Sequence, residues 1–316
     1  MSGDLQDVAS SLVDRARDAE ELEAYLTHQK TFSVKAYQGE PETVESAEPR
    51  GAGVRVFIDG RVGFAYTTDL TEPGLNDVVE QARANARHST PDDAAAPAPA
   101  WERPPEDVPG TFDSSHRDVS ADEKVAFAVD LEVATRAADS RVRTVEEAVY
   151  ADSESEVAIA TTTGIVGSYV ETDAWCFAYA IASEGDDTQV ALEFDVARSL
   201  SGLDRELVAR TAAKRAAEGL GGEKIPSAKM PVIFEPYTSG QFLGVVAQAL
   251  TGEAAQKGRS LFAGRIGESV AAAGLTLVDD GRIEGGLGSS PWDAEGIPTD
   301  ARRSSRAGHC GRSSTT

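Results

Sequence analysis

The sequence predicts a multi-domain α+β protein in which antiparallel or mixed sheets are flanked by helices, with an incomplete β-rich domain near its C-terminal end. Three observations lead to this fold class. Stretches with apolar residues at helical spacing are separated by short runs of alternating or β-branched residues. Turn and cap residues punctuate those runs. The 316 residues are enough for two or three domains with hydrophobic cores of their own.

Residues 1–90 are expected to form the first α+β domain. Apolar residues at helical spacing predict helices over 4–30 and 72–88. Between these helices, alternation of apolar and polar residues predicts three strands, at 32–37, 53–58 and 61–66. Asp59-Gly60 separates the last two strands and is typical of a tight hairpin turn.

Residues 91–110 are rich in Pro and Ala without periodicity, which predicts a linker. Residues 111–222 are expected to form a central α+β domain with an antiparallel sheet. Ser120 and Glu123 have the spacing of a capping box, so a helix is expected to begin there and to end near Ala138. The domain is further predicted to contain five strands and a second helix, at 143–151, 155–161, 166–172, 175–183, 189–197 and 204–218.

Residues 223–299 are expected to begin a third domain. Apolar runs at 230–234 and 275–278 predict strands, and a helix is predicted between them, over 239–255. Four apolar residues of that helix recur at helical spacing and are expected to form one buried face: Leu243, Val246, Ala247 and Leu250.

The formal net charge of −23 argues against one class of function. Such a surface repels the phosphate backbone, so direct binding to DNA or RNA is not expected. The charge also exceeds what solubility requires. We therefore hypothesise a salt-rich cytoplasm, as in a halophile, where ions screen an acidic surface. An ordinary acidic protein is the alternative.

The sequence shows no membrane-spanning or signal-peptide pattern. No stretch approaches the ~20 apolar residues that a membrane span requires, so no membrane association is expected. The first residues are acidic rather than basic, and no signal peptide is expected. Cys176 and Cys310 are far apart in unlike contexts, which does not fit a disulfide framework. These features predict a cytoplasmic protein.

The sequence contains four histidines, His28, His88, His116 and His309. His28 and His88 are expected to close helices, where a cation complements the helix dipole. His116 is expected in a polar loop, and none of the four has the local spacing of a zinc site. Cys176 lies in an apolar strand between aromatic residues and is interpreted as a core residue rather than a nucleophile.

The glycine-rich segment that begins at residue 285 is the candidate contact region. It lacks a clear following helix, so it does not fit a phosphate-binding loop. Its glycines permit close approach of another backbone, such as a substrate peptide or a partner strand, and a plain turn is the alternative. The candidate substrate or partner contacts are Gly285, Gly286, Gly288 and Ser289.

Six segments of the sequence carry a family resemblance, at 50–56, 60–65, 231–234, 252–260, 275–280 and 285–296. They resemble the TldD/PmbA family, whose members were historically called modulators of DNA gyrase. The resemblance covers nearly the whole chain up to Thr299. It implies a cytoplasmic metalloprotease system of two related subunits, which enclose a chamber that admits unfolded peptide segments.

In that family the TldD-like subunit carries zinc on a His-Glu-x-x-x-His helix, with a Cys ligand much further along the chain. Alignment with the family places Leu243, Gly244 and Gln248 at the His, Glu and second His positions. Leucine cannot bind zinc, and glycine cannot act as a general base. The resemblance therefore implies the PmbA/TldE-like branch, with no metal or cofactor bound by this chain and zinc in the partner subunit.

Residues 300–316 depart from the resemblance. The family continues there with β-rich sequence, whereas this segment is basic and has no apolar periodicity. We expect an aberrant, disordered tail on a C-terminally truncated third domain. A frameshifted end is one hypothesis for its origin, and an ordinary basic tail is the other.

Three functions are compatible with the sequence. The first is the non-zinc subunit of a TldD-type peptidase complex, as a heterodimer with a TldD-like subunit or as a homodimer, in contact with a peptide substrate. The second is a peptidase that is active alone, with metal held by unrecognised residues. The third is a regulatory binding protein linked to DNA gyrase.

Overall fold

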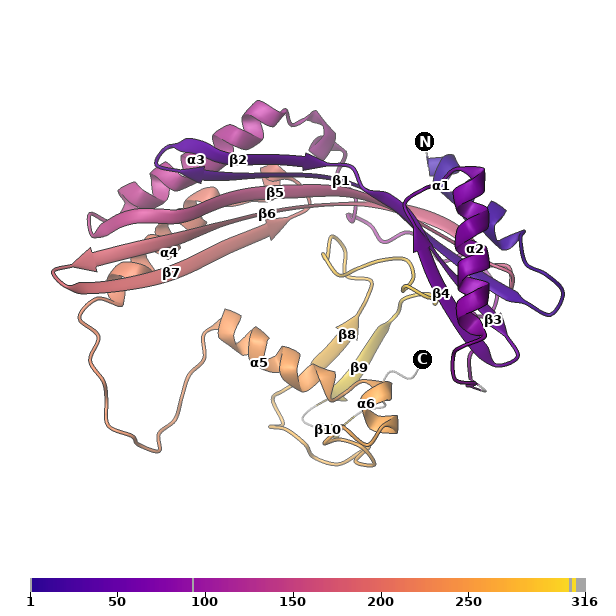
Figure 1. The fold of residues 1–316 in the computed structure, drawn as a ribbon. Coiled ribbons are helices and arrows are strands. Elements are labelled where there is room, and N and C mark those ends of the chain that lie inside the picture. The colour runs from indigo at the N-terminus through magenta and orange to yellow at the C-terminus, as the bar shows by residue number, and fades with distance from the viewer. Residues whose placement is uncertain (1, 93, 307–308, 311–316) are drawn as a thin grey trace. The chain divides into compact units, whose positions relative to one another are not determined.

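The computed structural model describes residues 2–92, 94–306 and 309–310, and it divides into two compact units (Figure 1). Unit 1 contains the residues up to Gly222 together with the segment Glu284–Pro298. Unit 2 contains Glu223–Ile283 and the described residues from Thr299 onward. Within the described residues, no helix combines the length and apolar character of a membrane span.

Unit 1 is built on a seven-stranded antiparallel sheet with the order β4-β3-β1-β5-β6-β7, in which β2 pairs with β1 (Figure 1). The strands are β1 (Glu21–Tyr37), β2 (Glu40–Ala47), β3 (Arg50–Ile58), β4 (Arg61–Thr67), β5 (Val142–Thr161), β6 (Val166–Glu184) and β7 (Asp187–Ala197). Its α-helices are α1 (Ser2–Val13), α2 (Glu72–Ala86), α3 (Ala121–Ala138) and α4 (Arg205–Glu218). Two short 3₁₀ helices complete the unit, η1 (Ser114–Asp118) and η2 (Leu200–Gly202).

One face of this sheet packs against all four α-helices. Leu22 and Leu26 of β1 join the core that the sheet forms with α1 and α2. Val34, further along β1, joins the core formed with α3 and α4. All three positions are even-numbered, so they point to the same face of the strand. The odd-numbered positions of β1 therefore face away from the helices, and we call that side the open face.

The hairpin and cap predictions for unit 1 are confirmed. Asp59 and Gly60 both have positive φ, 51° and 67°, between β3 and β4. Positive φ at both central residues is the backbone of a type I′ turn, one of the two common two-residue hairpin turns. Ser120 and Glu123 exchange both hydrogen bonds of a capping box at the start of α3.

The predicted helix over residues 4–30 is wrong beyond α1, which ends at Val13. From Glu21 the chain forms β1, because Leu22, Ala24 and Leu26 alternate into the core. His28 therefore lies in a strand, with its Nε2 2.8 Å from Oε1 of Glu48. The prediction also missed β2, whose residues are all exposed and so lack an apolar pattern.

The central strands are longer than predicted. The segments 143–151 and 155–161 are one strand, β5, and 166–172 and 175–183 are one strand, β6. Polar residues interrupt the apolar pattern midway along both strands, which made each appear as two. His116 lies in η1 rather than in an open polar loop, and its side chain is buried.

In the part that the structure describes, unit 2 has two helices and a small antiparallel sheet of order β10-β9-β8. Its elements are α5 (Pro236–Gln248), α6 (Gly252–Gln256), β8 (Leu277–Asp280), β9 (Ala301–Arg306) and β10 (His309–Cys310). The predicted single helix divides because Thr251 caps α6, with its hydroxyl accepting from the N–H of Ala254. No residue of α5 is buried, so the expected buried face of Leu243, Val246, Ala247 and Leu250 is wrong.

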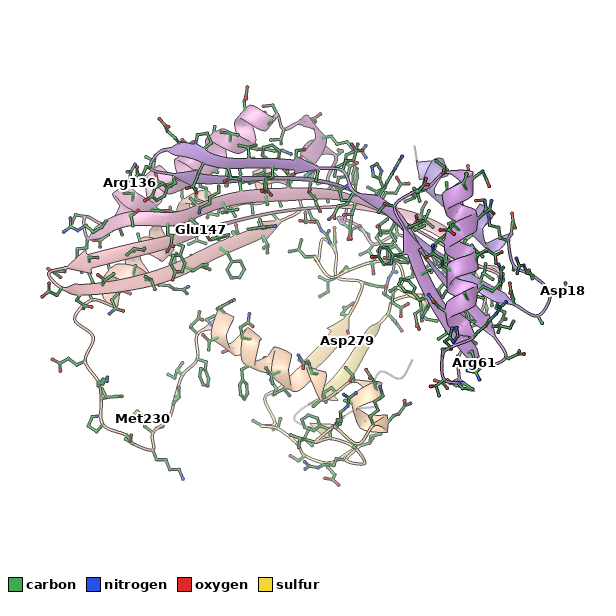
Figure 2. The ribbon with its side chains drawn as sticks, in the orientation of Figure 1. Asp18, Arg61, Arg136, Glu147, Met230 and Asp279 are labelled. Atoms are coloured by element: carbon green, nitrogen blue, oxygen red, sulfur yellow. The ribbon has the colours of Figure 1, made fainter. Side chains whose placement is uncertain are left out.

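Two further expectations for unit 2 need correction. Residues 230–234 are not a strand; Met230 lies on an irregular segment before α5 (Figure 2). Residues 301–306 are a strand paired with β8, so this part of the tail is not without regular structure. Residues 307–308 and 311–316 of the expected tail lie outside the described residues.

Candidate functional site

The candidate site lies on the open face at the β4 end of the unit 1 sheet. Glu23 of β1 is paired in register with Arg55 of β3, and Arg55 with Phe64 of β4. Two residues away, Tyr25 pairs with Gly53. Because side chains two apart on a strand share a face, these positions form a continuous patch across three strands.

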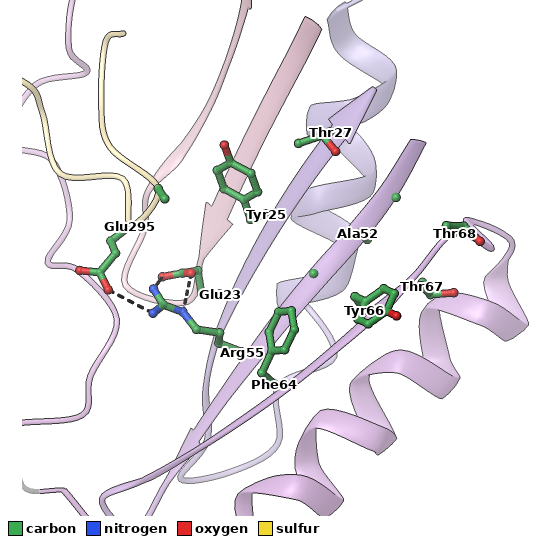
Figure 3. Close-up of a pocket in the computed structure, with 13 residues that line it drawn as sticks. Glu23, Tyr25, Thr27, Ala52, Arg55, Phe64, Tyr66, Thr67, Thr68 and Glu295 are labelled. Carbon is green, nitrogen blue, oxygen red and sulfur yellow. Dashed lines mark hydrogen bonds and ion pairs between the residues drawn. The ribbon is translucent and has the colours of Figure 1, made fainter. Parts of the chain in front are cut away.

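The patch is hollowed into a pocket of about 560 Å³ (Figure 3). Gly53 supplies the depression, because the ring of Phe64 lies 3.2 Å from the place that a Cβ of residue 53 would occupy. The lining residues are Glu23, Tyr25, Thr27, Gly51, Ala52, Gly53, Arg55, Phe64, Tyr66, Thr67, Thr68, Ala294 and Glu295.

Arg55 is the centre of the charged end of the pocket (Figure 3). Its Nε and Nη2 each donate to one carboxylate oxygen of Glu23, both at 2.7 Å. Its Nη1 donates to Oε1 of Glu295 at 3.1 Å. Burial raises the pKa of Glu23, which is only 3% exposed, although the hydrogen bonds from Arg55 oppose that shift. The nearby carboxylates of Glu295 and Asp293 raise the same pKa further.

Glu295 reaches the pocket from the segment Glu284–Pro298, which we call the strap. The side chain of Asp293 accepts hydrogen bonds from the N–H groups of Glu295 and Ile297, and this closes a tight turn. Such side-chain-to-backbone bonds are typical of Asp in turns. The turn therefore holds Glu295 in place by local hydrogen bonds.

Aromatic packing anchors the strap to the sheet. Trp292 is buried against Trp101 and Tyr169, with ring centroids 5.2 and 4.9 Å away. The indole N–H of Trp101 donates to the carbonyl of Gly296 at 2.6 Å. Gly167 leaves space for the two indole rings, since a Cβ at that position would lie only 2.8 Å from Trp101 and 3.0 Å from Trp292. The anchor thus fixes both ends of the turn that carries Glu295.

The glycines predicted as contacts lie elsewhere on the strap. The carbonyls of Gly285 and Gly286 accept hydrogen bonds from the guanidinium of Arg198. Ser289 is buried and its N–H donates to the carbonyl of Gly286. Of the residues that the structure describes, none beyond its chain neighbours comes within 4 Å of the place that a Cβ of residue 288 would occupy, so Gly288 borders open space. None of these four residues lines the pocket, whereas Glu295 of the same segment does.

A second feature of the open face is an apolar surface on β6 and β7. Cross-strand pairs place large apolar side chains in two rows on the side away from α4. Phe194, Leu192, Val190 and Val196 are all exposed, in the alternate positions of β7. The paired residues are Trp175–Val196, Phe177–Phe194, Tyr179–Leu192 and Ile181–Val190. An extended apolar segment of another chain is the kind of ligand that such a surface suits.

A third cluster, around Asp152, lies on the helix-covered face. Asp152 is buried and accepts from the hydroxyl of Tyr150 at 2.6 Å, and the ammonium of Lys124 lies 2.6 Å away. His116 Nε2 is 3.8 Å from its other oxygen. Burial and the bond to Asp152 raise the pKa of Tyr150. These contacts join α3 and η1 to β5, and we interpret the cluster as structural.

The residues at the expected zinc-motif positions do not fit a zinc ion. Leu243 and Gly244 on α5 offer no donor atom, and Gln248 offers a neutral amide where histidine is needed. Across the described ranges, no group of three or more His, Cys, Asp or Glu side chains is arranged to hold a metal.

In comparison with known proteins, the chain resembles metallopeptidase-related proteins along most of its length. Residues 22–86 match the PmbA/TldA metallopeptidase domain 1, residues 114–220 the central domain and residues 227–309 the C-terminal domain of that group. The chain belongs to the PmbA/TldD family. The match to the C-terminal domain extends beyond residue 299, into the segment that the sequence resemblance excluded.

Relatives show the same relationship. The metalloprotease PmbA of Escherichia coli O157:H7 is 27% identical over 276 residues, which cover 86% of this chain and 60% of that protein. A candidate modulator of a DNA gyrase from Thermotoga maritima has the same fold, with a TM-score of 0.85 at 23% identity over 98% of this chain and 70% of that chain. TldE from Thermococcus kodakarensis gives a TM-score of 0.82 at 22% identity, with 98% and 68% coverage.

Proposed function

We propose that this chain is the non-zinc, PmbA/TldE-like subunit of a TldD-type peptidase complex that acts on unfolded peptide segments in the cytoplasm. The observation that carries the proposal is the chemistry of α5. By the sequence resemblance, Leu243, Gly244 and Gln248 of α5 align with the positions at which the family's zinc motif has its ligands and general base, and none of the three can serve in those roles. The zinc and the hydrolysis are therefore assigned to a TldD-like partner.

The open face supports a role in holding peptide. It presents exposed apolar side chains of β7, including Leu192 and Phe194, and a pocket with a charged end at Arg55. Unfolded segments expose apolar side chains, which such a surface can bind. In the proposed complex, this chain contributes a peptide-binding wall and the partner contributes the metal.

Co-expression with a TldD-like subunit tests the assignment. We expect the two chains to co-purify. The zinc content of the complex, measured by mass spectrometry, should equal the amount of the TldD-like subunit, with no additional zinc for this chain. Cleavage of an unfolded protein substrate should require the partner and should be abolished by altering the partner's zinc ligands. Stoichiometric zinc in this chain purified alone, with peptide hydrolysis in the same sample, would contradict the proposal and support a self-sufficient peptidase.

A regulatory role is the second candidate, because the Thermotoga maritima neighbour is named a candidate modulator of a DNA gyrase. The acidic surface disfavours contact with DNA but not with a protein. A pull-down from native extract separates the two functions. Recovery of a TldD-like subunit supports the peptidase complex, and recovery of gyrase subunits without it supports regulation.

A further inference from the structure

We propose that the pocket beside Arg55 binds the basic side chain of a lysine or arginine in an extended peptide. The inference rests on the proposed function for its ligand class, a peptide. The choice of side chain rests on the pocket itself, which nothing in the peptidase proposal specifies.

The charge balance of the pocket favours a cation. Among the described residues that line it, Arg55 is the one basic residue, and it is bound by two carboxylates, Glu23 and Glu295. The lining thus carries one more negative charge than positive. Asp293 adds to this field, since its carboxylate and that of Glu295 both act to raise the pKa of Glu23. A bound ammonium or guanidinium would relieve this excess.

Glu295 is placed to make the contact. Its side chain is 54% exposed, so it retains access to solvent and to a ligand. It accepts from Arg55 through Oε1. Among the described residues, Oε2 of Glu295 receives no hydrogen bond, and it is therefore available to a charged donor. Glu23 differs, because Arg55 engages both of its oxygens.

The rest of the pocket suits the aliphatic part of a basic side chain. Phe64 and Tyr66 are exposed and stacked, with ring centroids 6.3 Å apart. Gly51 and Gly53 leave the strand surface beside them without side chains. Lysine and arginine lay their methylene groups on apolar surface while the charged end stays near water. Exposed aromatic faces also attract a cation directly.

Competing ligands fit less well. A ligand carboxylate would have to displace Glu295 from Nη1 of Arg55 and would add negative charge to a pocket that already has an excess. A neutral aliphatic side chain would gain the aromatic contact but leave Oε2 of Glu295 without a donor. The pocket should therefore rank lysine above norleucine, and norleucine above glutamate.

Peptide titrations followed by NMR test this ranking on the full chain. The probes are acetylated, amidated pentapeptides with lysine, norleucine or glutamate flanked by two glycines on each side. At low salt we expect the lysine peptide to bind at least about tenfold more tightly than the norleucine peptide. The preference should decrease as salt is added, because the contact is partly exposed.

Two variants locate the effect. Glu295→Gln should remove most of the preference for lysine while leaving norleucine binding unchanged. Its matched control is Glu268→Gln, a glutamate with similar exposure that pairs with Arg265 at 2.8 Å in unit 2. That variant should bind all three peptides as the unchanged protein does. Phe64→Ala should weaken lysine and norleucine peptides alike.

Several outcomes would overturn the inference: equal affinity for lysine and norleucine, tighter binding of glutamate, or no binding of any probe. A preference that survives Glu295→Gln would also overturn it. These readings are made without a partner subunit or zinc. Failure here therefore leaves the subunit proposal intact, and failure of the co-purification leaves the pocket chemistry intact.

Discussion

Gly63 of β4 lies so close to Ala82 of α2 that a Cβ on residue 63 would overlap the carbonyl oxygen of Ala82. The same atom would collide with the backbone of Ala86. Backbone contact of this kind brings α2 onto the sheet that carries the pocket. A glycine at this position is therefore required by packing rather than by its dihedral angles.

We expect Gly63→Ala to destabilise unit 1 by about 3 kcal/mol, because the helix must move away from the strand. Gly244→Ala is the control, since a Cβ there would meet no described atom within 4 Å apart from the backbone of its own helix, α5. That change should be neutral or stabilise the helix by up to about 1 kcal/mol. Thermal melts and urea titrations of both variants measure the difference. Equal effects would contradict the packing argument.

The pair Glu23–Arg55 should show strong coupling in a double-mutant cycle. Arg55→Met leaves the buried carboxylate of Glu23 without its partner, and we expect a loss of about 3–5 kcal/mol of unfolding free energy. Adding Glu23→Gln should restore much of that loss, because no buried charge then remains. Urea denaturation of the single and double variants gives the coupling. Additive effects would show that the two residues are energetically independent.

Cys176 should be unreactive in the folded protein. Its side chain is fully buried, and burial raises the pKa of its thiol to about 12. In a Cys310→Ser background, Cys176 is the one cysteine left in the sequence. We expect a thiol reagent at pH 8 to label it only when the protein is unfolded in urea. Rapid labelling under native conditions would contradict this expectation and would support a nucleophilic role for Cys176.

Asp139 gives a defined dependence of stability on pH. Arg141 donates to both its carboxylate oxygens, and these hydrogen bonds lower the pKa of Asp139 from 3.8 to about 2. Because the folded-state pKa is the lower one, the stabilisation is present above pH 3.8 and is lost as the pH falls towards about 2. Asp139→Asn should melt below the unchanged protein at pH 7, and the gap should close across that acid range.

Arg141→Gln is the companion to that experiment. It removes the donors and should show the same narrowing of the gap in melting temperature as the pH falls. A gap that stays constant between pH 5 and pH 2 would show that Asp139 does not contribute through its charge.

The net charge of −23 predicts a salt-dependent stability. Repulsion among surface carboxylates weakens when ions screen it, so the melting temperature should rise by several degrees from low salt to multimolar KCl. A matched titration with sucrose controls for general solute effects. Equal melting temperatures at both salt concentrations would favour an ordinary acidic protein over one adapted to a salt-rich cytoplasm.

Much of the fold could be predicted where local signals agree. The hairpin at Asp59-Gly60 and the cap at Ser120 are determined by residues within one turn of each other, and both predictions are confirmed. The prediction was wrong at the start of β1. There the alternation of Leu22, Ala24 and Leu26 follows soon after a helix that has an apolar spacing of its own, so the two patterns together resemble one helix. The exposed strand β2 has no apolar pattern to read.

The candidate site was harder to predict because its residues come from distant parts of the sequence. Arg55 meets Glu23 across 32 positions and Glu295 across 240. No periodicity relates such residues; only the strand register brings them together. The sequence did single out the segment that contains Glu295, through its glycines and its family resemblance. It could not show that the carbonyls of those glycines accept hydrogen bonds from Arg198 and from the neighbouring backbone. Nor could it show that the carboxylate of Glu295, further along the same segment, lines the pocket.

The strap makes unit 1 discontinuous in sequence, with 61 residues of unit 2, Glu223–Ile283, synthesised before it. During synthesis on the ribosome, the sheet strands therefore emerge before Trp292 and Glu295. Until those two residues are made, the aromatic cluster on the sheet and Arg55 remain incompletely covered. A fragment that stops at Gly222 would share this unfinished state. A shortened protein that keeps the pocket must instead join Gly222 to Glu284 through a designed loop, so that the strap remains part of the same polypeptide as the sheet.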